Sequence, residues 1–288
     1  MDAPMTHAVF GHPVAHSLSP RIHAAFAAQL GIPMRYGAID APPDTFAEAL
    51  AAFAGAGGRG ANVTLPHKQA ALALCTTTTA RARRAGAVNT LVRIDDGWHG
   101  DITDGSGLLR DLARHRIGLP GRNVLILGAG GAARGIAGPL LDAGIASLAI
   151  ANRTRATAAA LANAMADARA RPLDIDALGM SGAFDIVINA TSATRTTTLP
   201  AWPATVVHAG TACLDLGYGD AATAFLAWSR TAGAAAAIDG LGMLVEQAAE
   251  SFSAWHGAWP DAEAVLHMLG TRRDTSGFPD RDPLRRDE

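Results

Sequence analysis

The chain has 288 residues, 49% of them hydrophobic and 17% charged, and its formal net charge is −2. This length is enough for two domains, and a charge so close to zero gives no general basic field to attract nucleic acid or an anionic membrane. Cys75 and Cys213 are isolated in sequence, so they predict neither a metal site nor a disulfide framework. Neither an export signal nor an apolar stretch of membrane-spanning length is evident. We therefore expect a cytoplasmic protein that acts on small molecules.

The first hundred residues alternate short β-prone runs with alanine-rich helical runs. Strands are expected at Ala8–Phe10, 35–39 and 60–64, and helices at 20–30 and 45–54, the second helix being capped by Asp44 or Thr45. This alternation is typical of βαβ units.

One lysine stands among the 24 basic residues of the chain, Lys68, and it closes the run 62–68, Asn-Val-Thr-Leu-Pro-His-Lys. Arginine stays protonated at any cellular pH, whereas the surroundings of a lysine can tune it to give and take a proton. A β-prone segment that stops at a proline delivers polar side chains to a strand end, where sites are common. The alternative is a solvated surface lysine in a composition biased toward arginine. We adopt the hypothesis that Lys68 transfers protons.

A second unit begins near Ser106. A helical pattern at 108–112 and a turn at 118–122 precede the apolar strand Val124–Leu127, and the helix after it extends through Leu141. Further strands are expected at 148–151, 186–189, 206–207 and 214–216, with a last long helix at 243–256. Strands separated by helices predict a parallel, doubly wound sheet. From Thr271 onward the tail is rich in Asp, Arg and Pro, which predicts disorder.

A glycine-rich turn follows the strand Val124–Leu127 at once, with Gly128, Gly130, Gly131 and Ala132 opening the next helix. Without side chains there, the backbone turns tightly, and its amides and the positive helix end can approach a pyrophosphate. This strand, turn and helix therefore predict a dinucleotide site.

The end of the following strand bears on which dinucleotide binds. An NAD site places an acidic residue there to accept the ribose 2′-hydroxyl, and that carboxylate repels a 2′-phosphate. Here the strand ends in Asn152, Arg153, Thr154 and Arg155. Two guanidinium groups and a hydroxyl suit a dianionic phosphate, so we predict NADP rather than NAD. The alternative is that both arginines are solvated residues at a helix start.

Taken together, these motifs resemble the shikimate dehydrogenase family, and the match covers residues 8 to 268. The resemblance rests on His-Ser-Leu-Ser-Pro at 16–20, the run 62–68, Gly-Ala-Val-Asn-Thr at 86–90, Thr-Asp-Gly at 103–105, the glycine turn with Asn-Arg-Thr at 152–154, Asn-Ala-Thr-Ser at 189–192 and the run 239–248. Each alone could be chance, but their order is specific.

The resemblance implies an α/β fold with two domains. Residues 1–105 would form an α/β substrate domain completed by helices in 240–270, and residues 106–239 a Rossmann-type NADP domain with a doubly wound parallel sheet. The substrate would lie in the cleft between them. The family reaction is the reversible NADPH-dependent reduction of 3-dehydroshikimate to shikimate, a step toward aromatic amino acids. A monomer or a homodimer is compatible with the sequence.

The resemblance also implies the site. Lys68 and Asp104 match the catalytic pair: Lys68 is the general acid in reduction and the base in oxidation, which suits the proton that a nascent alkoxide requires. Matched substrate-binding positions are Ser17, Ser19, Thr64, Asn89, Thr103, Tyr218 and Gln247. Matched cofactor-binding positions are Thr191, Gly240 and Met243, beside Gly128, Gly130, Gly131, Ala132, Asn152, Arg153, Thr154 and Arg155. His16 and His67 border the site without a catalytic role.

The chain departs from the family pattern at three places, and one of them is Arg155, which follows Arg153 more closely than is usual. Ile102 stands where asparagine is usual, which removes a hydrogen bond that supports the catalytic loop, and Arg195 interrupts a loop that usually continues through glycine. Two other functions stay open: a quinate/shikimate dehydrogenase that uses NAD or both cofactors, and a non-catalytic NADP-binding sensor. The presence of both Lys68 and Asp104 argues against the sensor.

Overall fold

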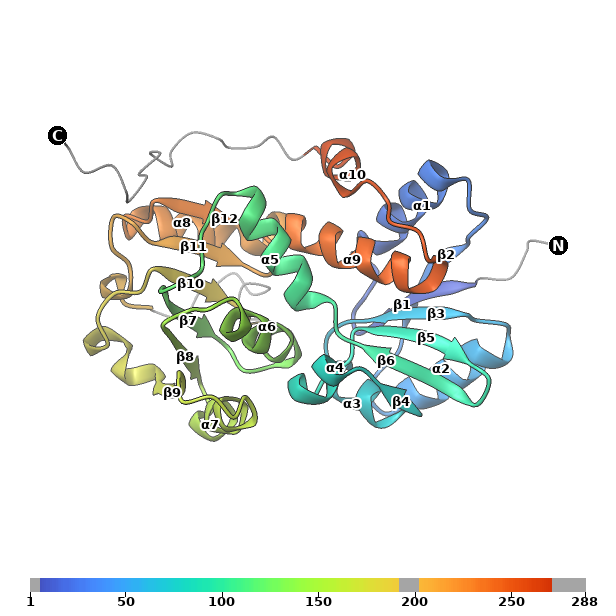
Figure 1. Cartoon of the computed structure of the whole chain (residues 1–288), viewed down its shortest axis with the longest axis horizontal. Coiled ribbons are helices and arrows are strands. Elements are labelled where there is room, and N and C mark those ends of the chain that lie inside the picture. The colour runs from blue at the N-terminus through green and yellow to red at the C-terminus, as the bar shows by residue number, and fades with distance from the viewer. Residues whose placement is uncertain (1–5, 192–201, 271–288) are drawn as a thin grey trace.

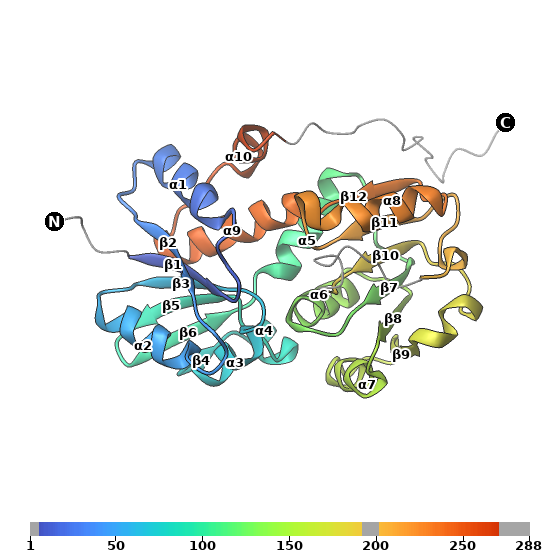
Figure 2. The same cartoon turned by 180° about the vertical axis from the view of Figure 1, so that it is seen from behind.

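The computed structural model describes residues 6–191 and 202–270, in which two six-stranded sheets lie side by side (Figures 1 and 2). The predictions for Ser192, Arg195 and the tail from Thr271 concern positions outside the described residues. None of the helices within the described ranges has the length and apolarity needed to cross a membrane.

The first sheet has the strand order β2-β1-β3-β5-β6-β4. Its strands are β1 (His7–Gly11), β2 (Tyr36–Asp40), β3 (Gly60–Val63), β4 (Thr77–Thr78), β5 (Thr90–Ile94) and β6 (Gly97–Asp101). Its helices are α1 (Ser19–Leu30), α2 (Phe46–Gly55), α3 (Lys68–Ala73) and α4 (Ala80–Ala85). The first three strands run parallel, as the βαβ pattern predicts, whereas β5 and β6 form an antiparallel hairpin that the sequence did not predict.

The second sheet is entirely parallel, in the order β12-β11-β10-β7-β8-β9, which confirms the predicted doubly wound fold. Its strands are β7 (Asn123–Leu127), β8 (Ser147–Asn152), β9 (Ala170–Asp174), β10 (Ile186–Asn189), β11 (Ala212–Asp215) and β12 (Ala236–Ile238). The connecting helices are α6 (Gly131–Asp142), α7 (Arg155–Ala164), α8 (Thr223–Thr231) and the short 3-10 turns η1 (Ile175–Met180), η3 (Ala204–Val206) and η4 (Gly219–Ala222). Residues 124–127 are fully buried, as expected for a central parallel strand.

Two local predictions are wrong. The apolar pair Val206 and Val207 is not a strand, because Val206 ends the 3-10 turn η3 and Val207 follows it, and both side chains pack in the core beside Trp202. Such a short apolar pair has no periodicity that could distinguish the two structures. Helix α2 begins after Thr45 as predicted, but the Thr45 hydroxyl donates to the Pro42 carbonyl oxygen instead of accepting from the helix.

Two further helices, α5 (Asp104–Arg114) and α9 (Leu241–His256), connect the two halves, and α10 (Ala262–Met268) packs against α1 and α9. Helices α5 and α9 pack along each other between the sheets (Figure 1). At its start α9 contributes Met243 to the core of the second sheet, and further along it contributes Val245 and Phe252 to a cluster with α1. The halves are therefore joined by shared apolar cores.

Candidate active site

A cavity of about 770 Å³ lies between the two halves, at the carboxyl ends of strands from both sheets. Open α/β sheets bind ligands at this edge. Fourteen of the predicted site residues line it: Ser17, Ser19, Thr64, Lys68, Asn89, Asp104, Gly130, Gly131, Ala132, Thr191, Tyr218, Gly240, Met243 and Gln247. His16 also lines the cavity, whereas the His67 ring is buried against Phe46 and bonds the Ala41 carbonyl oxygen.

Lys68 and Asp104 form an ion pair in the cavity wall, with 2.5 Å between Lys68 Nζ and Asp104 Oδ2. The side chains are only 13% and 5% exposed, so the pair is largely shielded from water. Each residue is the first of its helix, Lys68 of α3 and Asp104 of α5. A carboxylate at a helix N-terminus is stabilised by the helix dipole. The predicted catalytic pair is thus brought together from positions 36 residues apart.

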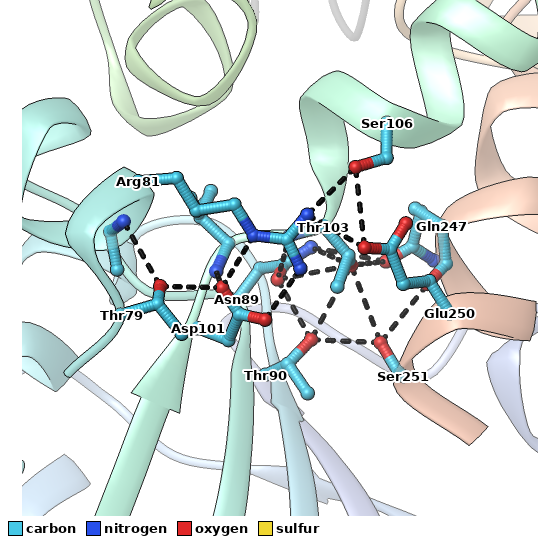
Figure 3. A network of polar contacts seen from close by, with 12 residues as sticks. Thr79, Arg81, Asn89, Thr90, Asp101, Thr103, Ser106, Gln247, Glu250 and Ser251 are labelled. Atoms are coloured by element: carbon cyan, nitrogen blue, oxygen red, sulfur yellow. Dashed lines mark hydrogen bonds and ion pairs between the residues drawn. The ribbon is translucent and has the colours of Figure 1, made fainter. Parts of the chain in front are cut away.

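The side chain of Asn89, which Figure 3 shows within a polar network, forms a hydrogen bond with Asp104. Its Nδ2 donates to Asp104 Oδ1 at 2.9 Å, to Thr103 Oγ1 at 3.0 Å and to Gln247 Oε1 at 3.1 Å. Its Oδ1 accepts from the Thr103 backbone N–H and the Thr90 hydroxyl. These bonds fix the amide's orientation, because both its nitrogen and its oxygen have partners. Thr103 is fully buried in this network and does not line the cavity.

Ser17, Ser19 and Tyr218 gather at another wall of the cavity. The Ser17 hydroxyl oxygen accepts from the Ser19 backbone N–H at 3.2 Å. Tyr218 follows β11 in the second half, and its hydroxyl oxygen accepts from the Leu18 backbone N–H at 3.4 Å. The phenol therefore reaches across the cavity to the loop that carries both serines. Three hydroxyl groups on one wall are suited to binding a carboxylate.

The glycine turn after β7 also lines the cavity. Gly128 has φ +106°, and a Cβ there would lie 2.9 Å from the Ala190 carbonyl carbon, so Gly128 serves the turn itself. Gly130 precedes α6 and faces the cavity, and a Cβ at Gly130 would meet no protein atom within 4 Å. Free backbone amides at the start of a twelve-residue helix fit a pyrophosphate. The described residues therefore fit the predicted dinucleotide.

Helix α6 packs closely against Lys68 and Asp104 because it has glycine at two positions. A Cβ on Gly131 would lie 2.9 Å from Lys68 Cβ, and a Cβ on Gly135 would lie 2.7 Å from Asp104 Oδ2. These glycines are one turn apart and face the same way. Gly131 was predicted as a cofactor residue, but Gly135 was missed, although its spacing of four residues from Gly131 was a signal.

The residues predicted to bind the 2′-phosphate lie at the end of β8 and the start of α7. Asn152 Nδ2 donates to the Thr154 carbonyl oxygen at 3.0 Å, which closes this turn. Arg153, Thr154 and Arg155 are exposed and do not line the cavity. They follow β8, the strand adjacent to β7, on the side expected for the adenosine end of a dinucleotide.

A buried carboxyl group that sequence reasoning missed supports the wall near Thr191. Asp215 Oδ2 accepts from Asn189 Nδ2 at 2.9 Å, and Asn189 Oδ1 accepts from the Thr191 hydroxyl at 2.7 Å. Burial raises the pKa of Asp215 to about 6, although hydrogen bonds from Asn189 and Gly217 oppose the rise. Asp215 follows no motif, and only the pairing of β10 with β11 reveals its role.

Models of known families match three parts of the chain. Residues 9–91 match the family described as shikimate dehydrogenase substrate binding domain, and residues 111–213 match shikimate / quinate 5-dehydrogenase. Residues 240–267 match the shikimate 5′-dehydrogenase C-terminal domain.

Individual relatives agree with the family models. The chain is 55% identical over 270 residues to shikimate dehydrogenase (NADP(+)) of Xanthomonas euvesicatoria, over 92% of this chain and 95% of the relative. An Ael1 enzyme from Pseudomonas putida superposes with a TM-score of 0.83 at 42% identity, over 92% of this chain and 98% of that one. Shikimate 5-dehydrogenase from Thermus thermophilus, in complex with NADP(H) and shikimate, superposes with a TM-score of 0.78 at 34% identity, over 91% and 97%.

Proposed function

The chain belongs to the shikimate dehydrogenase family, and we propose that its cleft reduces 3-dehydroshikimate reversibly to shikimate with NADPH. One observation carries the assignment of the chemistry. The shielded Lys68–Asp104 pair and the glycine turn at 130–132 line the same cavity. A proton donor and a dinucleotide cradle are the two parts that reduction of a ketone requires.

NADPH supplies a hydride to the substrate's ketone carbon when it is bound. The ketone oxygen then gains charge and needs a proton as the charge develops. Lys68 Nζ donates this proton in reduction, and the neutral amine accepts it in oxidation. Asp104 holds the ammonium in place through the 2.5 Å contact and accepts a hydrogen bond from a ring hydroxyl. Because the pair is shielded from water, its interactions with the reacting oxygen are strengthened.

The other polar side chains orient the substrate. Ser17, Ser19 and Tyr218 bind its carboxylate, while Thr64, Asn89 and Gln247 bind its ring hydroxyls. Thr103 supports this set by bonding Asn89 and Gln247 from below. Amide and hydroxyl groups of this kind discriminate against an analogue that lacks a hydroxyl, because they would be left unpaired.

Three groups of residues hold the cofactor. The amides at Gly130, Gly131 and Ala132 bind the pyrophosphate, with Gly128 shaping the turn. Arg153, Thr154 and Arg155 bind the 2′-phosphate, and Asn152 closes the turn that presents them. Thr191, Gly240 and Met243 also line the cavity, and they would contact the nicotinamide end of the cofactor.

The direct test follows NADPH formation with shikimate as substrate and compares NADP with NAD and shikimate with quinate. We expect shikimate with NADP to give the highest kcat/KM. Equal or better turnover with NAD or with quinate would favour a quinate/shikimate dehydrogenase. NADP binding without turnover of any cyclohexene acid would support a non-catalytic sensor.

The chain divides into two domains in this proposal. We assign residues 1–105 with 240–270 to the substrate domain and 106–239 to the NADP domain. A cytoplasmic location agrees with two unpaired cysteines, Cys75 and Cys213. Sedimentation would distinguish a monomer from a homodimer.

A further inference from the structure

A charged cluster lies beside the active site, centred on Arg81 of α4 (Figure 3). The guanidinium group binds Asp101 with two parallel bonds, Nε to Oδ1 at 2.7 Å and Nη2 to Oδ2 at 2.5 Å. Its Nη1 also donates to the Ser106 hydroxyl at 2.8 Å and contacts Glu250 Oε1 at 2.6 Å. The carboxylates of Asp101 and Glu250 are only 12% and 15% exposed, so each needs a cationic partner. Asp101 pairs with Arg81, whereas Glu250 is shared between Arg81 and Arg110, whose Nη1 lies 2.8 Å from Glu250 Oε2.

The partners of Arg81 flank the catalytic carboxylate in sequence. Asp101 ends β6 three residues before Asp104, and Ser106 lies two residues after it. Glu250 lies on α9, three residues and therefore about one turn beyond Gln247. The Arg81 side chain thus contacts the Asp104 segment on both sides of Asp104, at Asp101 and Ser106. It also contacts α9, the helix that carries Gln247.

The hydrogen bonds of Asp101 continue into the catalytic segment. Its Oδ1 accepts from the Ile102 backbone N–H at 2.7 Å and from the Thr79 hydroxyl at 2.7 Å. Burial works to raise the pKa of Asp101, but the bonds from Arg81 and Thr79 outweigh it and hold the pKa below its usual range. The carboxylate is therefore charged and firmly bound. It supplies backbone support at Ile102, where the side chain itself can form no hydrogen bond.

We propose that Arg81 is a positioning residue that sets the location of Asp104 through Asp101 and Ser106, and that of Gln247 through Glu250. This inference rests on the proposed function, because it concerns the same Lys68–Asp104 pair. A guanidinium fork fixes direction as well as distance, whereas a lysine ammonium acts as a point charge. Misplacement of a catalytic group by 1 Å can cost about 100-fold in rate.

The first test compares Arg81→Met, Arg81→Lys and the control Arg83→Ala. Arg83 lies on the same helix and is exposed, and its guanidinium group bonds the nearby Thr78 carbonyl oxygen. We expect Arg81→Met to lower kcat by about 10- to 100-fold while KM for NADP changes less than about twofold. Arg81→Lys should retain an intermediate kcat, and Arg83→Ala should match the wild type. Arg81→Met with a kcat within about twofold of the wild type would overturn the proposal.

A double-mutant cycle separates positioning from a general structural role. In an Asp104→Asn background the carboxylate is absent, so Arg81→Met should lower kcat by less than about threefold. If Arg81→Met lowers kcat as much in that background as in the wild type, then Arg81 does not act through the Asp104 carboxylate. Arg81→Lys serves in the same cycle if Arg81→Met does not fold.

Hydrogen exchange gives a readout that does not require turnover. Arg81→Met should speed exchange of the backbone amides at 102–106 by at least about tenfold, and Arg83→Ala should leave it unchanged. Unchanged exchange in Arg81→Met would refute the positioning role. A wild-type protein that fails to oxidise shikimate would instead refute the proposed function, and the exchange comparison would still decide the role of Arg81.

Discussion

At the scale of single residues, Lys68 combines two properties that a proton donor needs. Its ammonium group faces the cavity, and Asp104 restrains it at 2.5 Å. Positive charge alone would be supplied equally well by arginine, which the chain uses at 23 of its 24 basic positions. A lysine at position 68 is explained if its ammonium group must release a proton.

Substitutions of Lys68 distinguish a role for its positive charge from a role in proton transfer. Lys68→Ala and Lys68→Arg should both lower kcat by about 100- to 10,000-fold, because neither side chain can give up a proton to the alkoxide. KM for shikimate should change only a few-fold, since a proton donor matters mostly in the transition state. Steady-state kinetics in both directions measure this. A Lys68→Arg variant with near-normal kcat would show that charge alone suffices.

A buried histidine should make stability depend on pH. Burial, together with the charge of His7, lowers the pKa of His23 to about 3. Its Nε2 bonds Asn62 Oδ1 at 3.1 Å, and within the described residues its Nδ1 has no hydrogen-bond partner. Protonation would therefore place an unpaired charge in the core.

The direction in which stability changes with pH follows from proton uptake by the unfolded chain. Unfolded histidine binds a proton below about pH 6.5, whereas folded His23 does not until about pH 3. Stability is therefore full above pH 6.5 and falls with decreasing pH, and His23 should account for a loss of about 2 kcal/mol at pH 5. Urea unfolding at pH 7 and pH 5 measures this loss. His23→Gln should reduce the difference, whereas the exposed control His267→Gln should not.

At the scale of elements, the approach of α6 to α3 and α5 assembles the site. The glycines at 131 and 135 leave room for Lys68 and Asp104 against the helix that also carries the dinucleotide turn. In the proposed function, the same helix would set the distance between the proton donor Lys68 and the bound cofactor.

Gly135→Ala should damage catalysis more than stability. The added Cβ would lie 2.7 Å from Asp104 Oδ2, so either the carboxylate or the helix must shift. Overpacking of this kind costs about 1–3 kcal/mol, and we expect kcat to fall by at least about tenfold because the shift acts on Asp104. Gly118→Ala is the control, because a Cβ there meets nothing within 4 Å. Equal kinetics in the two variants would contradict this account.

Some features of the site could be predicted from the sequence, and others could not. Lys68, Asp104 and the glycine turn were predictable because each lies in a compact motif at an element boundary. Thr103 belongs to such a motif too, yet its side chain is buried, because the direction in which a loop residue points is set by packing. Gly135 and Arg81 owe their roles to contacts with segments about 20 or more residues away, which single-sequence patterns do not encode. The Thr77–Thr78 strand was missed because it exists only through pairing with β6.

At the scale of the whole molecule, the cavity belongs to both halves, and so do the helices behind it. Helix α5 contributes Leu108 and Leu112 to the core of the second sheet, while Asp104 at its start joins the network of the first. Helix α9 likewise packs against both. Separating the halves would expose these shared apolar surfaces to water, which is unfavourable at about 25 cal/mol per Å².

The two halves should therefore unfold together, and a ligand of one half should stabilise both. Differential scanning calorimetry is expected to show one transition, and NADP at 100 times its Kd should add about 2.7 kcal/mol to the stability of the whole chain. NAD at the same concentration is the control, since Arg153 and Arg155 favour a 2′-phosphate. Tryptophan fluorescence, to which Trp98 of the first half and Trp202 of the second both contribute, should show a single transition at the same shifted midpoint as calorimetry. Two transitions, with only one moved by NADP, would mean that the shared helices do not couple the cores.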